Sequence, residues 1–543
     1  MEILPLEQCT LIIWQTPAGV KIREYDRMPR GTAAPALDRR ETLPEKALMS
    51  AKTRIEKDSM GEVAVPANAY YGAQTQRAIQ NFPISGEPMP KEFIRAHVML
   101  KKAAATVNRD LGLLKPEFAN AIVQAADEIL ADAPWSKNQF PIDIYQTGSG
   151  TSTNMNVNEV LAMRANEILA HQTSDPGAPD GNPGLSRSHP DLSSIPRPIH
   201  PNDHVNLGQS SNDTFPTSVQ IMAATMLQNR LRPVLRHLAE LFRSKSKEFW
   251  DVIKTGRTHL QDATPIRLGQ EFLGFAGQIE DGPMTELVFG NHALRSLPLG
   301  GTAVGTGVNT HPEFAPRVAA LLSEGSGLRD VLRHSQYFKI VRNHFWAQAC
   351  LDTLLTTHAT IRTVAVSLTK IANDIRWMSS GPRAGLGEIE LPAVQPGSSI
   401  MPGKVNPVIC ESVLMVCQRV IGNDAALTAA ATQCNFELAM SMPLAAKLLH
   451  ESITLLANAC ENFAKNCIDG IKATPRGPEL VEKGLMLATA LVPAIGYDAA
   501  ANIAKEAAKS NRTIREVARE KTQLPEEELT RLLDLEKLVD PRK

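Results

Sequence analysis

One eleven-residue run, from Gly397 to Pro407, combines more chemically useful side chains than any other part of the chain. It reads GSSIMPGKVNP, with two adjacent hydroxyls, one lysine and one asparagine among glycines and prolines. Glycine permits positive φ and proline fixes φ, so the run predicts irregular backbone with a defined path. Such a loop can offer amide N–H groups, hydroxyls and a cation to an anion. The alternative is a solvated connecting loop, but Ile400 and Met401 in its middle indicate that the segment packs against something.

Two further segments place several hydroxyl and amide side chains directly before a predicted helix. Residues 147–154 read TGSGTSTN, and residues 209–213 read QSSND. Ser, Thr and Asn are preferred caps of helix N-termini, which is the simpler interpretation. One helix needs one cap, however, and the first segment has six such residues. Hydroxyls at a helix N-terminus also suit a carboxylate, so the first segment favours a binding function, while the second is compatible with either interpretation.

The best acid–base candidate is His259, in the polar segment GRTHLQDATP at residues 256–265. A single histidine is more often structural than catalytic, and this chain has 13, so the polar setting is what distinguishes His259. Histidine exchanges protons near neutral pH because its ordinary pKa is about 6.5. Glu411, which follows Pro407 by four residues, is the candidate carboxylate that would orient it. The alternative for Glu411 is an ordinary acid in the first turn of a helix.

Composition limits the partners and the compartment. The 543 residues carry a net charge of −1, which argues against a broad basic surface and against nucleic acid as a partner. No apolar run approaches the roughly 20 residues that span a bilayer, and residues 1–53 do not resemble a secretory or transit segment. The seven cysteines form no C-x-x-C pair, so free thiols in the cytoplasm are expected. Metal-ligand and nucleotide-binding motifs are absent from the sequence, so no metal and no cofactor are expected.

Helical patterns dominate the chain after residue 53. Apolar faces predict helices near 90–111 and 234–242. Apolar residues spaced by seven predict a helix of roughly 30 residues that ends near residue 381, and they are Leu354, Ile361, Leu368 and Ile375. That row has more apolar surface than one chain is expected to cover, which indicates a bundle completed by other subunits.

Other patterns predict where helices stop. A second long helical region is expected over about 408–465, with a kink at Pro443. Residues 281–283 read DGP and predict a break, and residues 171–196 are rich in Pro, Ser, Gly and Asp and predict a surface loop. Two helices are expected near the C-terminus, at 477–508 and 512–535.

The Gly397–Pro407 run is similar to the signature loop of the fumarase/aspartase superfamily, and the resemblance covers residues 54–540. It implies a mainly α fold of three domains, whose central bundle of long helices assembles into the multi-helix core of a homotetramer. The domains it implies are an N-terminal lyase domain at 54–207, the bundle at 208–472 and a small C-terminal domain at 473–543. Residues 1–53 would be a flexible N-terminal extension.

Four sites resemble class II fumarases rather than aspartases. Aspartases have glutamine in place of His259, asparagine in place of His200 and alanine in place of Gly403, and they have GGAGT where residues 147–151 read TGSGT. The resemblance therefore implies reversible hydration of fumarate to (S)-malate through an aci-carboxylate intermediate, a step of the tricarboxylic acid cycle. The alternatives are an aspartate ammonia-lyase and a catalytically silent structural or binding homologue.

The same resemblance implies a role for each matching residue. Ser398 would remove the proton, and His259, oriented by Glu411, would act on the water or the leaving hydroxyl. The dicarboxylate substrate would be held by Ser149, Gly150, Thr151, Ser210, Ser211, Asn212, Thr258, Ser399, Lys404, Val405 and Asn406. A secondary anion site would comprise Arg197, His200, Pro201, Asn202 and Asp203. Each active site would take residues from several subunits.

Overall fold

The computed structural model describes residues 12–16, 19–23, 52–174, 192–284, 293–325 and 337–540. The chain divides into two compact units, Met1–Arg54 and Ile55–Lys543. In the first unit, strand β1 (Ile12–Thr16) pairs antiparallel with strand β2 (Gly19–Arg23). The division of the remainder at residues 207 and 472, and the flexibility of the extension, stay predictions. Most of the predicted loop at 171–196 lies outside the described residues.

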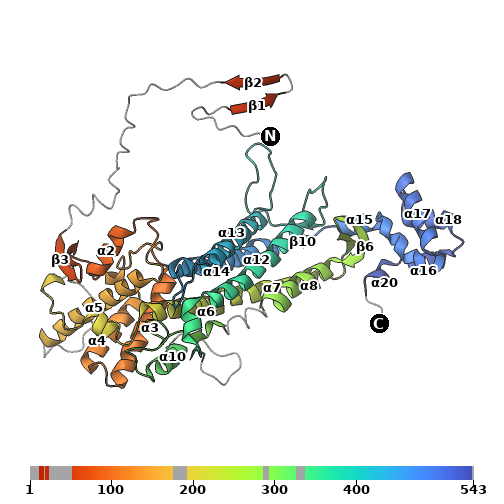
Figure 1. The fold of residues 1–543 in the computed structure, drawn as a ribbon. Coiled ribbons are helices and arrows are strands. Elements are labelled where there is room, and N and C mark those ends of the chain that lie inside the picture. Colours follow the sequence, from red (N-terminus) through yellow and green to blue (C-terminus); the bar gives the residue numbers. More distant parts are fainter. Residues whose placement is uncertain are drawn as a thin grey trace. The chain divides into compact units, whose positions relative to one another are not determined.

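Helices build the first part of the second unit (Figure 1). After the hairpin of β3 (Thr53–Asp58) and β4 (Gly61–Pro66), helix α3 packs against α4, α6 and α10. The apolar face predicted near 90–111 is the buried face of α3, which confirms that helix. The helices here are α2 (Ala73–Asn81), α3 (Lys91–Asp110), α4 (Pro116–Leu130), η1 (Pro134–Ser136), α5 (Thr151–Ser174), η2 (Leu192–Ser194), η3 (Pro201–Val205) and α10 (Phe314–Gly325).

Long helices lie side by side in the middle of the second unit (Figure 1). The longest, α12, has 27 residues and is therefore about 40 Å long. It packs against α13, and α13 packs against α14. This region confirms a mainly α fold with a bundle of long helices. Its members are α6 (Ser211–Met226), η4 (Leu227–Leu231), α7 (Arg232–Glu248), α8 (Leu268–Ile279), α12 (Asp352–Met378), α13 (Val408–Ala431) and α14 (Met442–Phe463).

The apolar row on α12 does not play the part predicted for it. Leu354, Ile361, Leu368 and Ile375 are all at most 4% exposed within the single chain. Because α13 and α14 already cover this row, it leaves no apolar surface for another subunit. The exposed apolar side chains are others, namely Val366 and Trp377 on α12 and Met415 and Ile421 on α13.

The predicted kink at Pro443 is also wrong. The chain forms two helices, and residues 432–441 connect the end of α13 to the start of α14. Pro443 lies in the first turn of α14, where its missing N–H has no intrahelical acceptor in any case. Ser441 precedes the helix with a φ of 62°, which redirects the chain. The expected break at 281–283 is confirmed, because α8 ends at Ile279 and a π-helical turn, η5 (Glu280–Met284), follows.

Short elements join the long helices. Strand β5 (Ile253–Thr258) pairs antiparallel with β6 (Gln261–Arg267), β7 (Ser296–Leu297) pairs parallel with β8 (Lys339–Ile340), and β9 (Ile389–Glu390) pairs antiparallel with β10 (Lys472–Ala473). Helix α11 spans His344–Ala349, and the π-helical turn η6 spans Ala464–Ile468.

The two helices predicted near the C-terminus are in fact several short ones around a separate hydrophobic cluster. Gly496, with a φ of 82°, and Asn511, with a φ of 52°, stop the regular helix. The elements are α15 (Arg476–Glu482), η7 (Leu485–Leu491), α16 (Val492–Ile495), α17 (Tyr497–Ser510), α18 (Ile514–Lys521), α19 (Glu526–Leu532) and α20 (Leu535–Val539). Across the described ranges, we find no helix long and apolar enough to cross a membrane.

Candidate active site

Hydroxyl side chains meet where α5 and α6 begin. The hydroxyl oxygens of Ser149 and Thr151 lie 2.8 Å apart, and those of Thr151 and Ser211 also lie 2.8 Å apart. Asn212 is next to Ser211, and its Nδ2 donates to the Ala303 carbonyl at 2.8 Å. The structure thus brings together four predicted substrate-binding residues, Ser149, Thr151, Ser211 and Asn212, which we call the hydroxyl cluster. Two helix N-termini converge on it, so it offers both hydroxyls and partial positive charge to a carboxylate.

Two other predicted residues shape the cluster from within the backbone. Gly150 has a φ of 75°, and a Cβ at this position would come 2.1 Å from the Phe215 ring, so only glycine fits. Ser210 is the N-cap of α6, because its hydroxyl accepts from the Asn212 N–H at 3.2 Å. The Asp213 carboxylate accepts in return from the Ser210 N–H at 3.0 Å. In this structure Ser210 therefore acts as a cap, and direct substrate contact stays a prediction.

Two buried ionisable side chains, Lys101 and Asp213, underlie the cluster, and the sequence analysis missed both. Lys101 on α3 is fully buried, and its Nζ donates to Asn206 Oδ1 at 2.8 Å and to Gln209 Oε1 at 3.1 Å. Asp213 is also fully buried, and it accepts from the backbone N–H groups of Gly300 and Thr302. Burial lowers the pKa of Lys101 to about 7, although the nearby Asp213 carboxylate opposes this shift. Burial raises the pKa of Asp213, against its backbone hydrogen bonds.

The sequence did contain a signal for this pair. Lys101 follows His97 by one helical turn on the apolar face of α3, where a charged side chain is unusual. The His97 ring lies between Ser218 Oγ, at 2.8 Å, and Asn154 Oδ1, at 3.1 Å. Burial and the neighbouring Lys101 charge lower the pKa of His97, so its ring is neutral. A polar row inside an apolar face marks a buried network, and this one connects α3 to the start of α5 and α6.

Most of the residues predicted to form a secondary anion site lie around a cavity of about 470 Å³. Arg197, His200, Pro201 and Asn202 line it, while Asp203 is not among its lining residues. The cavity is also lined by the acids Glu56, Asp58 and Glu159, and Arg197 forms an ion pair with Glu56. His200 Nδ1 accepts from the backbone N–H of Asn202, as an N-cap of η3. Anion binding here stays a prediction. A bound anion would have to compete with the Glu56 carboxylate for Arg197.

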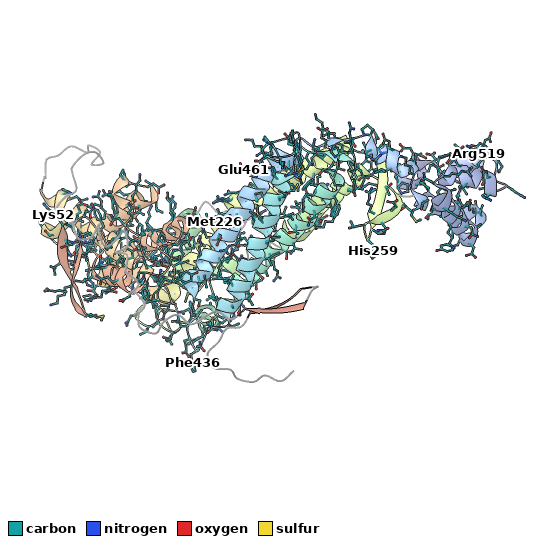
Figure 2. The ribbon with its side chains drawn as sticks, turned by 90° about the horizontal axis from the view of Figure 1, so that it is seen from above. Lys52, Met226, His259, Phe436, Glu461 and Arg519 are labelled. Carbon is teal, nitrogen blue, oxygen red and sulfur yellow. The ribbon has the colours of Figure 1, made fainter. Side chains whose placement is uncertain are left out.

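Thr258 and His259 lie at the tip of the β5–β6 hairpin. Thr258 pairs with Gln261, which leaves His259 and Leu260 as a two-residue turn. Both turn residues have positive φ, 55° and 58°, as tight hairpin turns of the I′ type require. His259 is exposed, and within the described part of the chain it makes no hydrogen bond or ion pair. The hairpin therefore presents this imidazole outward, away from its own chain (Figure 2).

The Gly397–Pro407 loop is held largely by its own backbone. Ser398 Oγ accepts from the N–H groups of Ile400, at 3.2 Å, and Met401, at 3.1 Å. The Asn406 side chain closes the loop by donating to the Gly397 carbonyl at 2.8 Å. The predicted packing of the loop centre is wrong within one chain, since Ile400 is 83% exposed. Ser399, Lys404 and Val405 are exposed as well.

The hydroxyl cluster and this loop lie at opposite ends of the bundle. The Met442 N–H, at the start of α14, donates to the Gly148 carbonyl beside the hydroxyl cluster. Twenty-two residues later α14 ends, about 33 Å away, and η6 follows it. There Cys467 Sγ lies 3.8 Å from Cys410 Sγ, next to Glu411. Phe436 lies in the connection that precedes α14. Figure 2 shows it and His259 at opposite ends of the long helices. One chain therefore cannot bring both groups to one small substrate.

His259 and Glu411 also remain apart as a pair. Glu411 is exposed in the first turn of α13, and none of the hydrogen bonds of the described residues joins it to His259. Their predicted partnership stays a prediction that requires contact between subunits. Among the described residues, no three His, Cys, Asp or Glu side chains are grouped so that they could hold a metal ion.

Comparisons with known proteins agree with this arrangement of motifs. Residues 61–422 match the lyase family, and residues 487–540 match the fumarase C C-terminal family. A class II fumarate hydratase of Thermosynechococcus vestitus is 47% identical over 492 residues, which are 90% of this chain and 99% of the relative. The corresponding protein of Nitrosomonas europaea is 49% identical over 466 residues, 86% of this chain and 94% of the relative.

Solved structures give the same result. The class II fumarase of Schistosoma mansoni superposes with a TM-score of 0.83 at 38% identity, and covers 91% of this chain and all of its own. A fumarate lyase:delta crystallin of Brucella melitensis, solved bound to cobalt, gives a TM-score of 0.80 at 43% identity, over 90% of this chain and all of its own. The long-helix bundle and the paired motifs thus define a lyase of the fumarase/aspartase superfamily. Within that superfamily the chain belongs to the class II fumarate hydratase family.

Proposed function

We propose that this protein catalyses the reversible hydration of fumarate to (S)-malate. The observation that carries the proposal is the Gly397–Pro407 loop, in which Ser398 Oγ already accepts two backbone N–H groups. Relatives that are 46–49% identical over most of the chain are class II fumarate hydratases. The presence of His259 and Gly403, where aspartases differ, favours water over ammonia as the group added.

The difficult step in the malate direction is removal of a C3 proton, because the charge left behind passes into the adjacent carboxylate. Ser398 would take that proton, and the Ile400 and Met401 N–H groups would stabilise its oxyanion. Lys404 and the loop amides would stabilise the aci-carboxylate. On the other carbon, His259 would donate a proton to the leaving hydroxyl, with Glu411 as its orienting carboxylate. The hydroxyl cluster and Thr258 would hold the substrate carboxylates.

We further propose a homotetramer in which each active site combines residues from several subunits. Support comes from the separation of about 33 Å between the hydroxyl cluster and the loop. It also comes from Val366, Trp377, Met415 and Ile421, large apolar side chains on α12 and α13 that are each at least 40% exposed. Light scattering at micromolar protein should give the mass of four chains. A monomer mass would contradict the shared site.

The cytoplasm is the proposed compartment. Six cysteines of the described residues are free thiols, as a reducing compartment permits. Cell fractionation with an antibody to the full chain should place the protein in the soluble cytoplasmic fraction.

The deciding experiment follows the ultraviolet absorbance of the fumarate double bond with purified protein and malate, fumarate or aspartate in turn. We expect interconversion of malate and fumarate without added metal or nucleotide, and the same rate after dialysis against EDTA. Faster release of ammonia from aspartate would make the protein an aspartase instead. Absence of turnover with all three substrates would indicate a silent homologue.

A further inference from the structure

A buried carboxylate, Glu388, binds Arg257 at the base of the hairpin that carries His259. The Glu388 side chain is 1% exposed. Its Oε1 accepts from Arg257 Nη2 at 2.8 Å, and its Oε2 accepts from Arg257 Nη1 at 3.0 Å. Such a two-point arginine–carboxylate contact fixes orientation as well as distance. Since Arg257 directly precedes Thr258 and His259, the contact lies one residue below the hairpin tip.

A second cation completes the network at the base. Lys254 Nζ lies 3.0 Å from Glu388 Oε2 and 2.9 Å from Glu271 Oε2, and its side chain is also 1% exposed. The network therefore holds two cations and two carboxylates, so its charges balance. Removing one carboxylate would leave two cations around a single acid, one of them fully buried.

The backbone of Glu388 is fixed independently of the hairpin. Its N–H donates to the Met378 carbonyl at the end of α12, at 2.8 Å, and its carbonyl accepts from the Thr474 N–H at 3.1 Å. Glu388 then leads directly into β9, which pairs with β10. The hairpin tip has no comparable support, because His259 makes no hydrogen bond within the described part of its chain and Leu260 is 66% exposed. Within the described part of its own chain, support for the tip therefore comes from the base of the hairpin.

We infer that Glu388 is a positioning residue for the hydration reaction, which fixes the β5–β6 hairpin through Arg257 so that His259 reaches the substrate of a neighbouring subunit. The inference rests on the proposed function. A catalytic group displaced by about 1 Å can lose about 100-fold in rate. Neither Glu388 nor Arg257 needs to touch the substrate for this effect.

The first test replaces Glu388 by glutamine, which keeps the shape and removes the charge. We expect kcat to fall about 10–100-fold and KM to rise by a smaller factor, because the hydroxyl cluster is untouched and only the proposed Thr258 contact moves with the hairpin. The matched control is Asp424→Asn. Asp424 is a buried carboxylate on α13 that binds His358 and Arg362, with no connection to the hairpin. The control should lower thermal stability without lowering kcat more than about twofold.

The second test combines Glu388→Gln with His259→Asn. If Glu388 acts through His259, its substitution should cost little further kcat once His259 is gone. A merely structural role would lower kcat by the same factor in both backgrounds. Should Glu388→Gln not fold, Arg257→Gln breaks the same contact from the partly exposed side and takes its place.

Hydrogen exchange provides a readout that does not depend on turnover. Amides of residues 253–267 should exchange faster in Glu388→Gln than in the wild-type tetramer, and should be unchanged in Asp424→Asn. If the wild type hydrates fumarate but Glu388→Gln keeps normal kcat, or if Asp424→Asn loses kcat equally, the inference is overturned. If the wild type shows no hydration of fumarate, the proposed function fails. Independently of turnover, unchanged hydrogen exchange of the hairpin in Glu388→Gln would overturn the positioning role.

Discussion

The two ends of the helix bundle differ in how completely one chain builds them. At one end, the hydroxyl cluster is tied into a buried network through Asp213, Lys101 and Asn206. At the other end, the loop at 397–407 and the hairpin tip are exposed, and the side chains of Lys404 and His259 make no hydrogen bond in the described part of the chain. The predicted substrate-binding groups of the hydroxyl cluster are therefore fixed within one chain, whereas the predicted proton-transfer groups are presented outward.

This difference suggests a division of labour. A dicarboxylate must be held by donors that do not move, and a buried network supplies that rigidity. The predicted proton-transfer groups, at a bundle end about 33 Å away, cannot reach the hydroxyl cluster of their own chain. An isolated chain would then keep the contacts of its hydroxyl cluster to substrate but turn the substrate over hardly at all.

The largest effect is expected at Ser398. Ser398→Ala removes the proposed base and its two hydrogen bonds from loop N–H groups, but it leaves the Asn406 contact that closes the loop. We expect kcat to fall about 10²–10⁴-fold with a smaller change in KM. The neighbouring Ser399→Ala is the matched control, because Ser399 is predicted to bind substrate and should raise KM more than it lowers kcat. Steady-state kinetics measure both. Near-normal turnover in Ser398→Ala would show that Ser398 is not the base and that the loop only covers the substrate.

Mixing two inactive variants tests whether the two ends serve the same site. Ser398→Ala damages the exposed end and Asn212→Ala damages the hydroxyl cluster. If each site takes these residues from different subunits, tetramers reassembled from equal amounts of the two should regain about a quarter of wild-type activity, since that share of sites combines two intact parts. Reassembly of each variant alone is the control. No recovery in the mixture would place both ends in one subunit's site.

The sequence predicted the secondary structure best where one periodicity acts over many residues. Helix α12 and the caps of α5 and α6 were expected, because spacing and capping are local signals. Pro443 was misjudged because a proline is equally at home in the first turn of a new helix, and only the reversal at residues 432–441 decides between the two. The heptad row on α12 was assigned to other subunits, although α13 and α14 cover it within the chain.

For the candidate site, the sequence identified the side chains that face solvent or substrate but not those beneath them. Motifs located the hydroxyl cluster and the loop. They did not locate Lys101, which binds Asn206 from 105 residues away, or Glu388, which binds Arg257 from 131 residues away. Such pairings depend on how distant elements pack, which no local pattern encodes. The relation between His259 and Glu411 depends on a neighbouring subunit and stays a prediction.

A smaller effect is expected from Lys101→Met, which tests the buried end. Burial lowers the pKa of Lys101 to about 7, so the side chain is charged below that pH and neutral above it. Of the groups near it, Asp213 on α6 favours the charged form, and His97 is neutral. In the wild type, KM for the dicarboxylate should therefore rise as pH increases through 7. The variant should have a KM raised about tenfold and independent of pH near 7.

Lys102→Met is the matched control for that experiment, because Lys102 is the next residue but is exposed and pairs with Asp127 at the surface. It should keep the wild-type KM and its pH dependence. If Lys101→Met retains the rise in KM through pH 7, the charge beneath the cluster belongs to another group, and the network serves only packing.

The smallest effect concerns the contact that fastens the cluster end to the bundle. Glu92 on α3 accepts from His450 Nε2 on α14 at 2.7 Å, and this hydrogen bond lowers the pKa of Glu92 to about 2. Because the folded-state pKa lies below the unfolded one, the contact stabilises the fold above about pH 4.5 and loses this contribution as pH falls toward 2. The Glu92→Gln variant should melt no more than about 2 °C lower at pH 6, since the carboxylate is 40% exposed. The difference in melting temperature should shrink below pH 4.5.

Glu117→Gln is the control, because Glu117 is an exposed first-turn acid of α4, and it should show no such trend. A melting difference that stays constant from pH 6 to pH 3 would mean that Glu92 holds the two regions together by packing and not by its charge.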